Sequence, residues 1–223
     1  MKVLMIIGSP KQNHSTSEKI GNHVCDKLIA KGHSISKVNA ALALMTDSGT
    51  KTLIDSAKNA DLLFLTFPLY VDSLPACLTK ACEILSKSFP GSGKKVAAIS
   101  NSGFPEPLHN NSALEILKNF ARQSGLVWVG GVSVGCGAAL TSRKPMKLEE
   151  HGSMVSRLQK TLDLFANILA NGITCSEYLE TVAQPLPAWL YCMMGNSGWN
   201  KAAKRRGMTK KDLFAKPLLT IKI

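Results

Sequence analysis

Runs of apolar residues alternate with helical patterns along most of the chain. Residues 61–67 are apolar almost without interruption, which is typical of a central strand buried on both faces. Residues 154–171 place apolar side chains at spacings of three and four, as one face of a helix requires. Five repeats of this alternation predict an α/β fold, a doubly wound parallel sheet with helices on both faces. Strands are expected at 3–7, 34–38, 61–67, 95–100 and 127–134, and helices at 16–31, 47–59, 75–87, 111–123 and 154–171.

The alternation stops near Gly172, and the rest of the chain follows no such rhythm. Residues 173–223 contain Pro185, Pro187 and two short helical stretches. Proline interrupts helices and central strands because it lacks a backbone N–H. We therefore expect one domain over residues 1–172 and a basic, partly helical C-terminal extension over residues 173–223.

The composition is that of a globular protein. The chain has 223 residues, of which 45% are hydrophobic, enough for a sizeable core. The apolar run at 3–7 is shorter than the roughly 7–15 residues of a secretory signal, so we expect a cytoplasmic protein. None of the six cysteines forms a Cys-x-x-Cys pair or a zinc pattern with histidine. Free thiols and no metal site are the expectation.

The net charge of +12 is concentrated near the C-terminus. Residues 199–223 carry eight lysines and arginines against Asp212 alone. Residues 187–211 could contact a membrane surface or a partner protein, or could dock on the sheet edge or a dimer interface with their lysines in solvent. The second interpretation is favoured because the basic run lacks a clean amphipathic helix. Nucleic-acid binding is not expected, since no interleaved aromatics or recognition motif accompany the charges.

The loop after the first predicted strand has the character of a phosphate-binding loop. Residues 9–17 place small hydroxyl and amide side chains and one lysine before a helix. The opening N–H groups of that helix and its dipole favour an anion. Alternatively, Ser15 or Thr16 is only the helix cap, which would explain one residue and not the whole set. The candidate phosphate-binding residues are Ser9, Lys11, Asn13, Ser15, Thr16 and Ser17.

Two further loops are expected beside the first, because ligands of open parallel sheets bind at the carboxyl ends of the strands. Two prolines stiffen the loop at 67–75, so the N–H groups of residues 70–72 can face a flat ligand, with Tyr70 at its border. In the other loop, Gly103 permits a close approach. Each loop alone could be an ordinary turn. The candidate residues are Pro68, Leu69, Tyr70, Val71 and Asp72, followed by Asn101, Ser102, Gly103 and Phe104.

Two glycine-rich stretches fail the common nucleotide patterns. Residues 91–95 resemble part of a P-loop, but they precede a strand and lack Ser or Thr after the lysine. Residues 135–137, Gly-Cys-Gly, follow the fifth predicted strand but lack the third glycine of a dinucleotide turn. We interpret the second stretch as a loop that closes the same site.

Together the three loops resemble those of the NADPH-dependent FMN reductase family, within the flavodoxin-like superfamily. The resemblance covers roughly residues 1–172. It rests on Gly8-Ser-Pro-Lys-Gln-Asn13 with Ser15-Thr16, on Pro68-Leu-Tyr70 with Leu74-Pro75, and on Asn101-Ser-Gly-Phe-Pro105.

The resemblance implies a five-stranded sheet of order 2-1-3-4-5 with FMN at the switch point between strands 1 and 3. The FMN phosphate would lie in the loop at 9–17, and the isoalloxazine would rest against residues 68–73 and 101–105. The implied activity takes hydride from NADPH or NADH and passes electrons to small-molecule acceptors such as flavins, quinones, or nitro or azo compounds. Members of this kind are often homodimers.

The sequence departs from the family pattern in places that concern dimer contacts and substrate stacking. Thr79 stands where a lysine is usual, Glu83 where an aspartate is common, and Val71 where a tryptophan is often found. Two other functions stay open: a one-electron carrier of flavodoxin type, and a module that binds FMN or senses without catalysis. Such carriers are usually acidic, unlike this chain. No catalytic acid or base is assigned, because the flavin itself carries the redox chemistry.

Overall fold

The computed structural model describes residues 1–11, 14–88, 90–141, 146–175, 177–184 and 186–215. It divides the chain into two compact units, Met1–Pro185 and Leu186–Ile223.

The first unit is built on a six-stranded sheet in which every neighbouring pair is parallel. The order is β2-β1-β3-β4-β5-β6, so the first five strands follow the expected order 2-1-3-4-5. The strands are β1 (Lys2–Ile7), β2 (Ser34–Asn39), β3 (Leu62–Pro68), β4 (Lys95–Asn101), β5 (Val127–Gly135) and β6 (Leu179–Val182).

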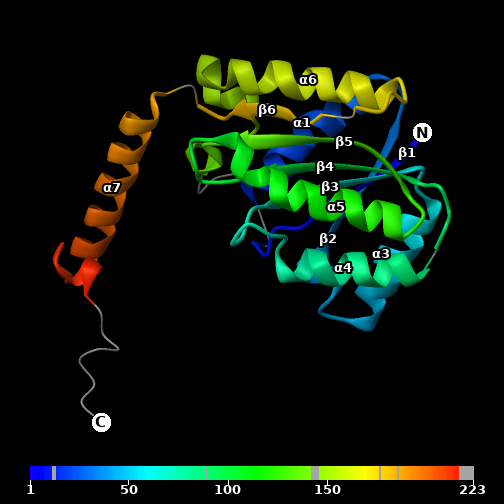
Figure 1. The fold of residues 1–223 in the computed structure, drawn as a ribbon, viewed down its shortest axis with the longest axis horizontal. Coiled ribbons are helices and arrows are strands. Elements are labelled where there is room, and N and C mark those ends of the chain that lie inside the picture. Colours follow the sequence, from blue (N-terminus) through cyan, green and yellow to red (C-terminus); the bar gives the residue numbers. More distant parts are fainter. Residues whose placement is uncertain (12–13, 89, 142–145, 176, 185, 216–223) are drawn as a thin grey trace, which may run out of the picture. The chain divides into compact units, whose positions relative to one another are not determined.

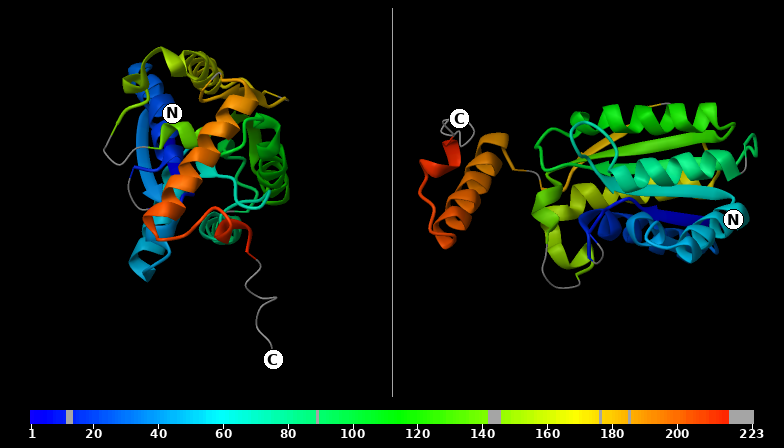
Figure 2. Two further views of the ribbon diagram at one scale, coloured as in Figure 1. Left: turned by 90° about the vertical axis from the view of Figure 1, so that its left-hand side faces the viewer. Right: turned by 90° about the horizontal axis from the view of Figure 1, so that it is seen from below.

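Helices cover both faces of this sheet. Helices α1 and α6 lie on one face, and α3, α4 and α5 lie on the other (Figure 1, Figure 2). The helices of the unit are α1 (Thr16–Ala30), α2 (Ala40–Ala43), α3 (Asp47–Asn59), α4 (Ala76–Ser88), α5 (Asn111–Gln123) and α6 (Ser156–Ala170). Short 3-10 turns are η1 (Pro107–Asn110), η2 (Gly137–Leu140) and η3 (Glu149–Val155).

The expectation of five strands was wrong by one. β6 pairs in parallel with Val132–Gly135 of β5 and forms the edge of the sheet. Its four residues are too short for periodicity to indicate a strand, and an edge strand buries only part of its surface. Because β6 pairs with β5, the first unit runs to Pro185, whereas the sequence suggested a boundary at residue 172.

The core of the first unit lies against β3, in the middle of the sheet. All residues of β3 from Leu62 to Phe67 are buried, as the apolar run at 61–67 indicated. Phe64 packs toward Phe165 of α6, with ring centroids 6.4 Å apart. The register pairs Pro68 with Asn101 at the end of β3 and β4. The loops that leave β1, β3, β4 and β5 therefore emerge at one edge of the sheet.

The second unit contains α7 (Ala188–Arg205) and the turn η4 (Asp212–Phe214). Pro187 precedes α7, where its missing N–H removes no helical hydrogen bond. Among the described residues, none of the helices combines the length and the apolar character needed to cross a bilayer.

Candidate functional site

A cavity of about 270 Å³ opens at the carboxyl ends of the strands, where four loops meet. It contains eleven of the fifteen residues that the sequence proposed, together with three others. The lining residues are Ser9, Lys11, Ser15, Thr16, Ser17, Pro68, Leu69, Tyr70, Asn101, Ser102, Gly103, Gly137, Ala138 and Thr141. We call this cavity the loop pocket.

The first loop presents hydrogen-bond donors at the start of α1. Ser15 is the helix cap, since its hydroxyl accepts a hydrogen bond from the Glu18 N–H at 3.1 Å. The two interpretations of this loop are therefore compatible: Ser15 caps the helix and also lines the pocket. The backbone N–H groups of Thr16 and Ser17 open the helix, where they have no intrahelical acceptor. Lys11 adds a positive charge beside them.

Gly8 lets this loop approach the sheet closely. Its N–H donates to the carbonyl of Thr66 at 2.8 Å. A Cβ at this position would lie 2.7 Å from Cδ2 of Leu78 and 2.9 Å from Cβ of Phe67, which real side chains do not tolerate. The candidate phosphate-binding loop thus starts at a position where the packing leaves room only for glycine.

The second loop is a tight hairpin. Tyr70 and Ser73 exchange backbone hydrogen bonds of 3.1 Å, so the Tyr70 N–H is not directed at a ligand. Val71 and Asp72 between them have φ angles of 49° and 55°, in the left-handed region that a β-branched valine rarely adopts. Val71 is 97% exposed, and neither residue lines the loop pocket. Pro68, Leu69 and Tyr70 do line it, as proposed.

Asn101 holds three of the loops together. Its side-chain amide donates to the hydroxyl of Ser17 at 2.8 Å and to the carbonyl of Phe67 at 2.9 Å. The backbone carbonyl of Asn101 accepts a hydrogen bond from the Leu69 N–H at 2.8 Å. The residue is buried, so these hydrogen bonds lie out of competing water. One side chain thereby links the ends of β3 and β4 to the start of α1.

The remaining residues of the third loop divide between the pocket and the surface. Ser102 is buried and its hydroxyl accepts a hydrogen bond from the Asn110 amide at 3.3 Å. Gly103 lines the pocket with open space around it. Phe104 is half exposed and its ring packs at a tilt against His109 with centroids 4.8 Å apart, outside the pocket lining. Asn13 lies outside the described residues.

The loop after β5 forms the fourth wall. Gly137 donates to the carbonyl of Ser102 at 2.7 Å, and a Cβ on it would come within 2.9 Å of that oxygen. The hydroxyl of Thr16 lies 3.5 Å from the carbonyl of Gly137 and can donate to it. Gly137 therefore closes the site, as the Gly-Cys-Gly stretch indicated. Ala138 and Thr141 also line the pocket, and no sequence signal marked them.

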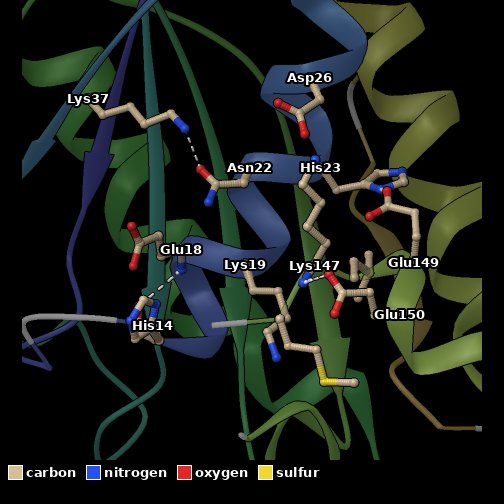
Figure 3. A pocket seen from close by; sticks show the side chains of 13 residues that line it. His14, Glu18, Lys19, Asn22, His23, Asp26, Lys37, Lys147, Glu149 and Glu150 are labelled. Carbon is tan, nitrogen blue, oxygen red and sulfur yellow. Dashed lines mark hydrogen bonds and ion pairs between the residues drawn. The ribbon is translucent and has the colours of Figure 1, made fainter. Parts of the chain in front are cut away.

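Two buried side chains of α1, Lys19 and His23, contact this fourth wall and the segments that follow it, in a neighbouring pocket of about 470 Å³ (Figure 3). Lys19 donates to the carbonyl of Leu140 at 2.7 Å, and its ammonium lies 3.0 Å from Nε2 of His151. Burial, and then the charge of Lys11, lower the pKa of Lys19. These contacts connect η2 and η3 to α1, the helix that follows the candidate phosphate-binding loop.

His23 makes the second set of contacts. Its Nδ1 lies 2.6 Å from Glu149 and its Nε2 lies 2.8 Å from Asp163. Both ring nitrogens therefore face carboxylate oxygens, and His23 connects η3 to α6. Both carboxylates and lysines line the neighbouring pocket, which distinguishes it from the loop pocket, where none of the described residues that line the cavity is a carboxylate (Figure 3). Among the described residues, no group of His, Cys, Asp and Glu could hold a metal ion, and all six cysteines are free thiols.

Comparison with protein families decides the family of this chain. Residues 1–140 match the model of the NADPH-dependent FMN reductase family, and this segment is more than half of the chain. The chain belongs to the NADPH-dependent FMN reductase family. The family and the flavodoxin-like fold inferred from the three loops are thereby confirmed. A search of curated proteins finds no match.

Solved structures similar to this family member share its fold at low identity. An FMN-dependent NADH-azoreductase from Bacillus anthracis, in complex with FMN, is 15% identical, with 77% of this chain and 100% of that chain covered and a TM-score of 0.53. An NADH:FMN oxidoreductase is 17% identical, with coverage of 79% and 91% and a TM-score of 0.56. A flavodoxin from Streptococcus pneumoniae is 17% identical, with coverage of 78% and 100% and a TM-score of 0.50.

The residues that line the loop pocket of this FMN reductase family member are of the kinds that a flavin mononucleotide requires. Lys11, the hydroxyls of the first loop and the N–H groups of α1 suit the phosphate. Pro68, Leu69 and Tyr70 supply an apolar border for a flat ring. A Cβ on Gly137 would meet the third loop, so the close contact between the third and fourth loops requires glycine at this position.

Proposed function

We propose that this protein is an FMN-dependent NAD(P)H oxidoreductase that passes electrons to a small-molecule acceptor. The observation that carries the proposal is the loop pocket, in which hydrogen-bond donors of the first loop and apolar side chains of the second loop line one cavity. Membership in the NADPH-dependent FMN reductase family supports the same cofactor and reaction class. When FMN is bound, it supplies the chemistry of hydride acceptance and electron release.

The first loop would bind the phosphate of FMN. Lys11 would offset its charge, and the N–H groups of Thr16 and Ser17 would donate to its oxygens. The hydroxyls of Ser9, Ser15, Thr16 and Ser17 are the further donors in reach of the pocket. Asn13 stays a candidate from the sequence alone.

The second and third loops would orient the ring. Leu69 and Tyr70 would pack at its edge, while Asn101 keeps the two loops at a constant separation through its hydrogen bonds. Val71, Asp72 and Phe104 lie at the exposed tips of these loops. From there they would contact a nicotinamide or an acceptor that approaches the ring from solvent.

The acceptor and the assembly belong to the proposal. Several similar structures are azoreductases, which supports flavins, quinones, and nitro or azo compounds as acceptor classes. We further propose that the protein works in the cytoplasm as a homodimer, with NADPH or NADH as the donor. Light scattering on the purified protein tests the dimer.

Anaerobic stopped-flow spectroscopy tests the activity. The protein loaded with FMN is mixed with NADPH and, separately, with NADH, and the flavin absorbance is followed. Bleaching by either nucleotide at a catalytically competent rate is expected. A protein that binds FMN but is bleached by neither nucleotide would be a one-electron carrier or a module that binds FMN without catalysis, and the flavodoxins among the similar structures make the carrier the second candidate. A protein that cannot be loaded with FMN would refute both.

A substitution at the phosphate end tests the proposed binding mode. Lys11→Gln should weaken FMN about 3-fold to 10-fold, since an exposed charge contact contributes about 1 kcal/mol. Riboflavin, which lacks the phosphate, should bind the variant and the native protein equally. Lys31→Gln, at the exposed C-terminal end of α1, is the matched control. An equal loss of riboflavin and FMN affinity would place the phosphate elsewhere.

A further inference from the structure

The C-terminal unit exposes large apolar side chains that its own fold does not cover. Trp189 and Trp199 of α7 are 68% and 69% exposed, and Phe214 of η4 is 76% exposed. Met193 and Met194 are also more than half exposed. Among the described residues of this unit, Ala203 is the one that is buried. Exposed tryptophans and methionines in such number usually mark a docking surface.

Three of the exposed apolar side chains of α7 lie on one side of the helix. Trp189 and Met193 are four residues apart, and Trp199 lies ten residues after Trp189, which brings all three within about 120° around the helix axis. Apolar residues fill the first two turns, whereas Lys201, Lys204 and Arg205 lie in the last two. The helix therefore passes from an apolar half to a basic half.

The charge of this unit is one-sided. Eight of the 27 lysines and arginines of the chain fall in residues 186–223, and the one acidic residue there is Asp212. The Asp212 carboxylate accepts hydrogen bonds from the N–H and the hydroxyl of Thr209, at 2.7 and 2.8 Å. The described cations are Lys201, Lys204, Arg205, Arg206, Lys210 and Lys211, and no ion pair is seen among the described residues of the unit.

A shallow groove of about 420 Å³ runs along α7 between its apolar and basic parts. Amide, hydroxyl and ammonium donors line it beside one methionine: Met193, Asn196, Ser197, Asn200, Lys201 and Lys204. Such a set suits an anionic oxygen-rich group that is joined to an apolar body. No carboxylate of the described residues lines this groove.

We propose that the unit Leu186–Ile223 docks on an anionic phospholipid surface. The tryptophans and methionines of α7 would enter the boundary between headgroups and acyl chains, and the cations would pair with lipid phosphates. Charge complementarity decides against a second copy of this chain, because residues 1–185 are themselves net basic, with 19 cations against 14 carboxylates. A nucleic acid would match the cations but would leave the apolar side chains of the first two turns exposed.

The structure of α7 also bears on the alternative of a tail docked on the sheet edge or a dimer interface, which the sequence favours because the basic run lacks a clean amphipathic helix. The observed helix runs continuously from Ala188 to Arg205, with its apolar and basic residues separated mainly along its length. Long lysine and arginine side chains can reach headgroups from several positions around a helix, so a strict polar face is not required.

Vesicle binding of the full-length protein tests the proposal. The chain has three tryptophans, and Trp128 in β5 is the one outside α7. In a Trp128→Phe background the tryptophan emission therefore reports on Trp189 and Trp199 alone. Vesicles of phosphatidylcholine mixed with phosphatidylglycerol should shift this emission to the blue and sediment the protein. Vesicles of phosphatidylcholine alone should do neither to a comparable extent, and high salt should weaken binding to the mixed vesicles.

Two sets of variants separate charge from apolar contact. The triple variant Lys204→Gln, Arg205→Gln, Arg206→Gln should weaken partitioning about 100-fold, since each cation near an anionic surface contributes about fivefold. A matched triple variant at exposed lysines of the first unit, Lys31→Gln, Lys51→Gln and Lys58→Gln, should change it far less.

The apolar contribution has its own variants. Trp189→Ala with Trp199→Ala should reduce sedimentation with mixed vesicles by at least tenfold.

Several results would overturn the proposal. Absence of binding to the mixed vesicles, or equal binding to both kinds of vesicle, would do so. A dimer whose tryptophan emission is blue-shifted without lipid, and which the tryptophan substitutions dissociate, would also overturn it, because the surface would then bind a second copy of the chain. If a DNA duplex displaced the protein from mixed vesicles as effectively as free anionic lipid does, binding would be non-specific and electrostatic, and the proposal would fail. None of these readouts requires bound FMN, so they stand apart from the proposed oxidoreductase activity.

Discussion

The Asn101 side chain offers a direct test of how the site is held together. Asn101→Ala removes the two hydrogen bonds that its amide donates to Ser17 and to the carbonyl of Phe67. Both acceptors lie in the interior, where water does not replace the lost donor easily. The loops that leave β1, β3 and β4 would then lose the side chain that joins them.

The magnitude follows from the two hydrogen bonds. Each neutral hydrogen bond contributes about 1 kcal/mol net, so the free energy of unfolding should fall by about 2 kcal/mol. An acceptor left buried without a donor would raise the loss toward 4 kcal/mol. For a domain of this size a loss of 2 kcal/mol lowers Tm by about 4–8 °C.

Flavin binding should weaken as well, because the loops must be ordered again when FMN binds. An ordering cost of about 1–2 kcal/mol corresponds to a loss of about 5-fold to 30-fold in FMN affinity. Urea unfolding measures the first effect, and quenching of FMN fluorescence measures the second. Asn119→Ala, at an exposed position of α5, is the matched control and should change neither.

Two outcomes would refute this reasoning. If Asn101→Ala lowered stability but left the FMN dissociation constant unchanged, the three loops would not act together in binding. If stability stayed within about 0.5 kcal/mol of the native protein, the two hydrogen bonds would be redundant.

Three further predictions concern backbone conformation and pH. Gly137→Ala should weaken FMN binding about tenfold, because the new Cβ would meet the Ser102 carbonyl at 2.9 Å and push the fourth wall aside. Val71→Gly should raise the free energy of unfolding by about 1 kcal/mol, since glycine adopts a φ of 49° without strain. The hydrogen bond from Tyr178 lowers the pKa of Glu115. Its contribution to stability is therefore present above the ordinary carboxyl pKa and is lost as pH falls through the lowered pKa, so Tyr178→Phe should destabilise the protein at neutral pH and progressively less as the solution is made more acidic.

Each of these predictions has a control. Gly103→Ala places a Cβ in the same pocket with its nearest neighbour at 4.0 Å, so a loss equal to that of Gly137→Ala would rule out the steric explanation. Val38→Gly in β2 should lower stability, and a gain there would show that glycine acts through something other than φ. A Tyr178→Phe effect that is independent of pH would mean that packing dominates over the hydrogen bond with Glu115.

The secondary structure of the first unit could largely be predicted from the pattern of its residues. The buried run of β3 and the helical spacing of α6 are properties of consecutive residues, so the pattern of apolar positions predicts them. The meeting of the loops follows from the rule that parallel strands place their carboxyl ends at one edge. The order of the first five strands was what the resemblance to the reductase family implied. Short contexts hid other features, such as the four-residue edge strand β6 and the hairpin that takes Val71 and Asp72 out of the pocket.

The sequence by itself determined the fold class, the family and the loops that form the pocket, because these depend on residues that are neighbours in the chain. Only the tertiary structure decided what joins those loops. Asn101 reaches Ser17 across 84 positions, Lys19 reaches Leu140 across 121, and His23 reaches Asp163 across 140. No periodicity or spacing records such contacts, since they exist only after the strands have paired and the helices have packed.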